Sequence, residues 1–206
     1  MPEIIKVCGI TRPADAIAAA GAGATAVGMI FYRRSPRAVR VHEAAMISAV
    51  IPPGVAKVGV FVNEEPDQVL SIAEAARLDV VQLHGDEEPS YVDSLVGVRV
   101  WRALSAGPDF DPAFLADWNV EAVLLDAPAG DSYGGSGKQF PWDRAVAAKR
   151  FVPRVIVAGG LDASNVAQAI REVDPWGVDA SSRLESAPGQ KDPDQVRAYV
   201  EAALAG

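Results

Sequence analysis

The sequence predicts an α/β fold, a single-domain (β/α)8 barrel of the TIM type over residues 1–206. Short apolar runs alternate with alanine-rich helical stretches from one end of the chain to the other. The runs are mostly continuous in apolar character, which is typical of parallel strands covered on both faces. No linker or change of composition divides the chain, so eight strand–helix units fit one compact barrel.

Each predicted strand is a short apolar run. In chain order the strands are Ile4–Cys8, Thr25–Phe31, Ala56–Val62, Asp79–Leu83, Arg99–Ala103, Glu121–Asp126, Arg154–Ala158 and Gly177–Ser181. Helical periodicity is clearest at Pro66–Arg77, Asn165–Glu172 and Pro193–Leu204. Two of these segments open on a proline that follows an acidic residue, which is a helix start signal. A doubly wound sheet is the alternative fold, but the first turn lacks the G-x-G-x-x-G fingerprint.

Composition excludes several classes of function. A net charge of −8 and a pI near 4.8 argue against binding nucleic acid over a broad surface. No apolar run approaches the length that spans a bilayer, so no membrane partner is expected. The start Met1-Pro2-Glu3 lacks the basic region of a secretory signal. One cysteine cannot form an internal disulfide, which fits a cytoplasmic location.

Two predicted strands end in groups that can handle protons. The run before Cys8 delivers a thiol into a glycine turn, and the run before Asp126 ends in a carboxylate. In (β/α)8 barrels the catalytic groups come from the carboxyl ends of the strands. Cys8 and Asp126 therefore suggest a pair of one base and one acid. Taken alone, a single cysteine is more often a small buried hydrophobe.

The other strand ends also carry polar or glycine residues. They are the loop Arg33–Arg37, Asn63, His84-Gly85, Gly159-Gly160 and Ser181-Ser182. In order along the chain, seven motifs resemble phosphoribosylanthranilate isomerase of tryptophan biosynthesis. They are Lys6-Val7-Cys8-Gly9-Ile10-Thr11, Ser35-Pro36-Arg37, Val58-Gly59-Val60-Phe61-Val62-Asn63, Gln82-Leu83-His84-Gly85, Gly134-Gly135-Ser136-Gly137-Lys138, Ala158-Gly159-Gly160-Leu161 and Asp179-Ala180-Ser181-Ser182.

The resemblance implies an Amadori rearrangement that needs no cofactor. N-(5-phosphoribosyl)anthranilate would become 1-(2-carboxyphenylamino)-1-deoxyribulose 5-phosphate, with Asp126 as the acid and Cys8 as the base. A thiol has a pKa of about 8.5 and an aspartic acid one of about 4, so neither starts in its working state at neutral pH. The site must therefore stabilise the thiolate of Cys8 and the protonated form of Asp126.

The resemblance also implies where the two anionic ends of the substrate bind. Gly159, Gly160, Ser181 and Ser182 follow the last two strands, where such barrels commonly bind phosphate. Arg37 is the candidate for the anthranilate carboxylate, because a guanidinium forks onto carboxylates. His84 is interpreted as structural or substrate-orienting, with an acid–base role as the alternative.

Two segments call for separate expectations. Gly134, Gly135, Ser136 and Gly137 are predicted to form a lid, because the segment does not match a nucleotide-binding P-loop. After Ser181-Ser182 the family ordinarily continues Gly-Val-Glu, whereas this chain has Arg183-Leu184-Glu185. Arg183 is thus a further candidate phosphate ligand, or a side chain that only occupies the place of the glycine.

Alternatives from other classes remain open. Another phosphosugar barrel, a lyase or an epimerase, would need a Schiff-base lysine or metal-binding residues, and no metal site is predicted. A non-catalytic phosphate-ligand binder is the other alternative, and the chain is expected to be a monomer or a homodimer. Strand parity adds one structural expectation, an interior ion pair between Lys6 and Asp179.

Overall fold

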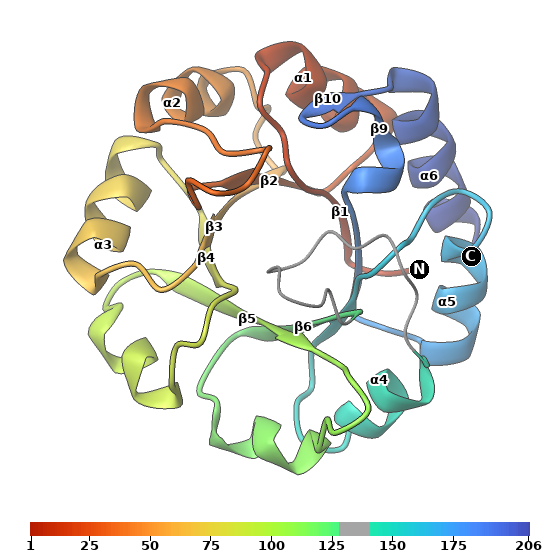
Figure 1. The fold of residues 1–206 in the computed structure, drawn as a ribbon. Helices are drawn as coiled ribbons and strands as arrows, with labels where there is room; N and C mark the ends of the chain where they lie inside the picture. The colour runs from red at the N-terminus through yellow and green to blue at the C-terminus, as the bar shows by residue number, and fades with distance from the viewer. Residues whose placement is uncertain (128–140) are drawn as a thin grey trace.

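The computed structural model describes residues 1–127 and 141–206. Within them, eight parallel strands close into a barrel in chain order, and β1 pairs with both β2 and β8 (Figure 1). The strands are β1 Ile4–Val7, β2 Ala26–Ile30, β3 Ala56–Phe61, β4 Val80–Leu83, β5 Arg99–Ser105, β6 Ala122–Asp126, β7 Val155–Val157 and β8 Gly177–Ala180. The predicted (β/α)8 fold is confirmed.

Helices surround the barrel (Figure 1). They are α1 Pro13–Ala22, α2 Val41–Ala49, α3 Pro66–Ala75, α4 Asp143–Ala148, α5 Val166–Val173 and α6 Pro193–Ala205. Helices α3 and α6 begin at the prolines that the sequence marks, and the Asp192 carboxylate caps α6 by accepting the N–H groups of Asp194 and Gln195. None of the described helices has the length and apolar character needed to cross a membrane.

Two connections depart from regular strand–helix alternation. The segments after β4 and β5 form short 3-10 helices, η1 Pro89–Ser94 and η2 Pro112–Asp117, instead of α-helices. Each opens on a proline, and only Leu115 within them is buried. With so little apolar surface, neither segment gains enough from packing to extend an α-helix.

The chain after β8 also differs from a simple unit. A third 3-10 helix, η3 Ser182–Leu184, leads into a small antiparallel hairpin of β9 Glu185–Ala187 and β10 Gln190–Lys191. The hairpin lies beside α1 and precedes α6 (Figure 1). It places Glu185 next to Arg37, and Lys191 next to Ser181, at the carboxyl ends of the barrel strands.

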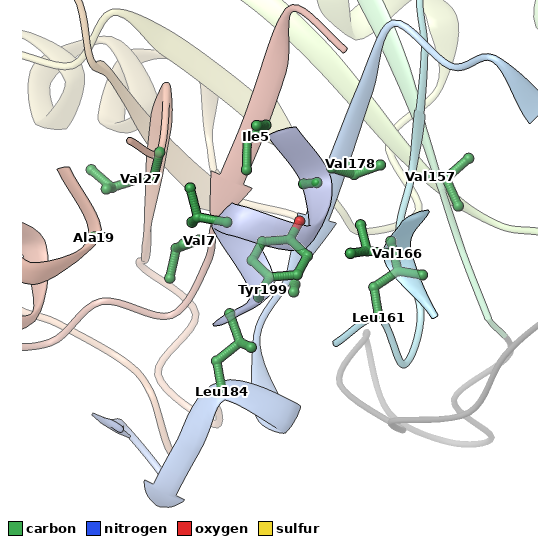
Figure 2. Packing of buried hydrophobic residues seen from close by; sticks show 14 of the residues in the cluster. Ile5, Val7, Ala19, Val27, Val157, Leu161, Val166, Val178, Leu184 and Tyr199 are labelled. Carbon is green, nitrogen blue, oxygen red and sulfur yellow. The ribbon is translucent and has the colours of Figure 1, made fainter. Parts of the chain in front are cut away.

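Alternation along β1 separates the outer core from the barrel interior. Ile5 and Val7 are fully buried among residues of the surrounding helices. Figure 2 shows the Tyr199 ring of α6 packed among Val7, Val178 and their neighbours. Lys6 lies between them in sequence and points the opposite way, as a strand requires.

The predicted interior ion pair is confirmed. The Lys6 ammonium is fully buried, and its Nζ lies 2.9 Å from Oδ2 of Asp179. The two residues are direct neighbours in the β1–β8 register. The pairing compensates the large cost of removing an ammonium group from water.

Candidate active site

One cavity at the carboxyl ends of the strands brings the main predicted residues together. It is lined by Cys8, Arg37, His84, Asp126 and Ser181, together with Ile30, Tyr32, Ser35, Val60, Val62, Gln82 and Asp179. These residues come from six different strands, β1, β2, β3, β4, β6 and β8, or the loops that follow them. The carboxyl ends of all the strands lie at the same end of the barrel. Cys8 and Asp126 therefore line the same cavity, although they are 118 positions apart in the chain.

Cys8 directly follows β1, and both of its backbone polar groups are bound to the end of β8. Its N–H donates to the carbonyl of Ala180, and its carbonyl accepts a bond from the Ser181 hydroxyl at 3.1 Å. Gly9 then turns with a φ of +75°, and a Cβ there would lie 2.6 Å from Cδ of Arg37. The glycine is therefore required both for the turn and for the approach of Arg37 to the thiol.

Burial and the charges of neighbouring residues both act on the pKa of the Cys8 thiol. Burial raises the pKa of Cys8, and the positive charge of Lys6 opposes that rise. Asp179 raises the pKa further, whereas Lys191 lowers it. The net effect is a pKa above the ordinary value, so the thiol is protonated in the unliganded site at neutral pH.

Asp126 is the last residue of β6 and is 8% exposed. Its Oδ1 accepts the N–H of Ala127 at 2.7 Å. Gly159 packs directly against it: a Cβ on that glycine would lie 3.0 Å from Asp126 Oδ1 and 2.7 Å from the Ala127 nitrogen. The position of the carboxylate therefore depends on a bare backbone at the end of β7.

The predicted phosphate residues line a second cavity beside the first. Gly159, Gly160, Ser181 and Ser182 surround it, and Asp126 and Asp179 line both cavities. The two glycines have φ values of +83° and +63°, a conformation that favours glycine. Such turns can present backbone N–H groups to an anion.

Arg183 lies apart from this second cavity. Its Nη1 donates to Oδ2 of Asp162 at 2.9 Å, and its side chain is 47% exposed. It lines a different hollow with Ser164 and Gln195. The structure thus places the Arg183 side chain against Asp162, and not in the cavity lined by Gly159, Gly160, Ser181 and Ser182.

Arg37 is oriented by residues that the sequence did not reveal. Its Nε and Nη2 donate to the two carboxylate oxygens of Glu185 at 2.8 and 2.7 Å. Lys191, 2% exposed, also donates to Glu185 at 2.8 Å and to the carbonyl of Ser181. These bonds use the Nε and Nη2 edge of the guanidinium, and Arg37 also lines the cavity that contains Cys8.

His84 is held as a neutral imidazole. Burial and the positive charges of Lys6 and Arg102 lower the pKa of His84 to about 4. At neutral pH the ring is therefore a hydrogen-bonding group and not a cation. This state supports the interpretation of His84 as a residue that orients the substrate.

A buried clamp fixes the backbone on both sides of His84. The His84 N–H donates to the carbonyl of Phe61. The next N–H, that of Gly85, donates to the Glu87 carboxylate, and Arg102 donates to the Gly85 carbonyl at 2.9 Å. Arg102 also pairs with Glu87, both side chains being almost fully buried. Sequence reasoning missed this clamp, because no motif or periodicity links residues 87 and 102.

The remaining predictions concern a lid and a metal site. The predicted lid residues, Gly134, Gly135, Ser136 and Gly137, lie outside the described residues. Within residues 1–127 and 141–206, no group of three or more His, Cys, Asp or Glu side chains is arranged to hold a metal ion.

The fold and the site together define a (β/α)8-barrel enzyme with its active site at the carboxyl ends of the strands. Residues 5–202 match the family model described as N-(5'phosphoribosyl)anthranilate (PRA) isomerase. The chain belongs to this family.

Similar proteins support the assignment over the full length. The chain is 51% identical over 202 residues to the N-(5'-phosphoribosyl)anthranilate isomerase of Solibacter usitatus, covering 98% of each chain. The crystal structure of phosphoribosyl anthranilate isomerase from Thermotoga maritima superimposes with a TM-score of 0.93, 35% identity and complete coverage of both chains. A phosphoribosyl anthranilate isomerase in complex with reduced 1-(o-carboxyphenylamino)-1-deoxyribulose 5-phosphate gives a TM-score of 0.89, 33% identity and complete coverage.

Proposed function

We propose that this enzyme isomerises N-(5-phosphoribosyl)anthranilate to 1-(2-carboxyphenylamino)-1-deoxyribulose 5-phosphate, with Asp126 as acid and Cys8 as base. The observation that carries the assignment of roles is the shared cavity, which Cys8 and Asp126 line together with Arg37 and His84. Family membership supports the reaction, and the geometry supports the residues.

The reaction balances without an external oxidant or reductant. Asp126 gives its proton to the ring oxygen as the bond from that oxygen to C1′ breaks, and the nitrogen lone pair forms a Schiff base. Cys8, as the thiolate, removes the proton on C2′, and those electrons give an enolamine. Protonation at C1′ and loss of the hydroxyl proton then leave a ketone at C2′. Carbon 2′ is oxidised while carbon 1′ is reduced.

The same cavities suggest how the substrate is oriented. The phosphate would bind at Gly159, Gly160, Ser181 and Ser182, whose cavity shares Asp126 with the thiol cavity. The anthranilate carboxylate would meet Arg37. With its two charged ends held apart, the sugar would lie between Cys8 and Asp126, which is the arrangement that the chemistry requires.

A direct assay tests the proposed activity. Phosphoribosylanthranilate is generated in solution from anthranilate and phosphoribosyl pyrophosphate by a coupling enzyme, and the decay of its fluorescence is followed after addition of this protein. We expect enzyme-dependent decay proportional to protein concentration. Binding of the product without any acceleration of decay would instead identify a non-catalytic phosphate-ligand binder.

Assembly and location complete the proposal. We infer a monomer or homodimer acting in the cytoplasm on a small phosphosugar, without nucleic acid, membrane or cofactor. Sedimentation velocity at assay concentrations measures the assembly directly. A larger, stable oligomer would contradict this part of the proposal without affecting the assigned chemistry.

A further inference from the structure

A buried ammonium group lies next to the thiol that the proposed mechanism uses as a base. Lys6 precedes Cys8 by two residues, so both side chains point to the barrel interior. The Lys6 side chain is fully buried and Cys8 is 6% exposed. Asp179, across the β1–β8 pairing, accepts a bond from Lys6 Nζ through Oδ2 at 2.9 Å.

A glycine on the neighbouring strand lets the two side chains meet. Gly28 of β2 faces the same interior, and a Cβ placed there would lie 2.7 Å from Cys8 Sγ and 3.2 Å from Lys6 Cε. The position that a Cβ of residue 28 would occupy is thus within contact distance of both the Cys8 sulfur and the end of the Lys6 side chain. The missing side chain of Gly28 provides the space in which thiol and ammonium approach each other.

Four charged groups from different elements act on the thiol. Lys6 on β1 and Lys191 on β10 favour its anionic form, and Asp179 on β8 disfavours it. Arg37, in the loop after β2, also interacts electrostatically with Cys8. Lys191 and Arg37 are both bound to Glu185. The Lys6 ammonium is bound to Asp179 and interacts electrostatically with Cys8, and its charge also acts on the neutral His84 ring.

We propose that Lys6 is the counter-ion of the Cys8 thiolate, and that Asp179 sets how much of the lysine charge the sulfur receives. This inference rests on the proposed role of Cys8 as the base. Ionisation sends the thiol proton to solvent, and the resulting thiolate takes the C2′ proton from the substrate. Lys6 acts through Cys8 and is therefore a positioning residue, not a proton donor.

The two partners of this ion pair should affect the thiol in opposite directions. Lys6→Met removes the stabilising cation, so thiolate formation should need a higher pH. Asp179→Asn removes the competing anion, so thiolate formation should need a lower pH. A general loosening of the barrel would move both variants in the same direction.

The single cysteine makes the experiment specific. Thiolate formation is followed by ultraviolet difference absorbance against pH in the full-length protein, with Cys8→Ser as the blank. We expect the midpoint to rise by about 1 to 3 pH units in Lys6→Met and to fall in Asp179→Asn. The rise of kcat with pH should move with each midpoint, whereas KM should change little.

Controls separate a failure of this inference from a failure of the proposed function. Arg99→Gln removes a cation at the other end of the barrel and should leave the midpoint unchanged. If Lys6→Met alone does not fold, Lys6→Met/Asp179→Asn removes both charges, and its midpoint should still lie above that of the parent. Unchanged or same-direction midpoints in the two single variants would overturn the role of Lys6. Full turnover by Cys8→Ser would overturn the role of the thiol itself.

Discussion

Strand β5 carries two arginine–glutamate pairs whose surroundings differ. At its amino end Arg99 forms two bonds to Glu121, both 2.9 Å, and the arginine side chain is 50% exposed. Three residues further on, Arg102 pairs with Glu87, and the two side chains are only 4% and 2% exposed. Exposed pairs contribute little to stability, whereas breaking a buried pair leaves an uncompensated charge. Burial, rather than residue type, therefore decides which of the two pairs matters for the stability of the folded protein.

The same contrast holds between the two ends of the barrel. At the carboxyl ends, polar groups are buried and bound by their neighbours: Cys8 and Asp126 are 6% and 8% exposed, and both lie in hydrogen-bonded backbone. At the amino ends, the charged side chains are more exposed: Arg99 and Arg154, both about half exposed, share Glu121 as their partner. Function should therefore respond strongly to small changes at one end and weakly to equal changes at the other.

The largest effect is expected from the two proton-transfer groups. Cys8→Ser and Asp126→Asn keep the size of each side chain but remove the proposed base and acid, so kcat should fall by about 100- to 10,000-fold. Affinity for the product should change little, because both variants preserve the charged binding groups. Steady-state kinetics and product titration measure the two quantities. Near-normal turnover in either variant would remove that residue from its assigned role.

A glycine pair gives the next largest contrast. Gly159 and Gly97 have nearly equal φ values, +83° and +85°, but a Cβ on Gly97 would meet nothing within 4 Å. Gly159→Ala should displace Asp126 and lower kcat by about 100-fold. Gly97→Ala should cost only the backbone strain, roughly 1 kcal/mol of stability, with kcat unchanged. Equal kinetic losses in the two variants would contradict the contrast.

Substitutions at Arg102 and Arg99 test the comparison between the buried and the exposed ion pair directly. Arg102→Gln leaves Glu87 buried without its cation and should lower the free energy of unfolding by about 3–5 kcal/mol. Arg99→Gln should lower it by about 1 kcal/mol or less. Urea unfolding at neutral pH measures both. Double substitution Arg102→Met with Glu87→Leu should recover part of the stability, because it leaves no unpaired charge.

The same clamp should affect the titration of His84. Since the charge of Arg102 helps to lower the pKa of His84 to about 4, Arg102→Gln should raise that pKa towards the ordinary value. A pKa lower in the folded state means that His84 supports stability above about pH 6.5. That contribution is lost as the pH falls towards 4. NMR titration of the imidazole in both proteins measures the shift. An unchanged midpoint would show that Arg102 does not influence the pKa of His84.

The smallest effect is expected at Arg183. Because its guanidinium is bound to Asp162 at the surface, Arg183→Ala should change KM by less than about threefold. Inhibition by inorganic phosphate should also be nearly unchanged. A tenfold rise in both constants would instead show that the side chain reaches the phosphate when substrate is bound.

The sequence predicted the features that follow from local pattern. Apolar runs located the strands, and strand parity placed Lys6 beside Asp179. Strand ends selected Cys8 and Asp126 as groups that share one mouth. The polar partners that orient the site were not predictable in this way. Glu87 with Arg102, and Glu185 with Lys191, are brought together by loops, and no periodicity in the chain records those contacts.

Secondary structure shows the same division. Helices α3 and α6 have clear start signals and an apolar stripe, and they begin where expected. The segments at η1 and η2 carry the same proline signal but bury little apolar surface, and they form only short 3-10 helices. A start signal predicts where a helix can begin, whereas packing decides whether it extends.

A crystal structure of this enzyme with reduced 1-(o-carboxyphenylamino)-1-deoxyribulose 5-phosphate would test the central claim most directly. The sugar carbons should lie between Cys8 Sγ and the Asp126 carboxylate, with the phosphate at the turn of Gly159 and Gly160 and the anthranilate carboxylate on Arg37. A ligand bound away from Cys8 and Asp126, or reversed so that its phosphate contacts Arg37, would contradict the assignment.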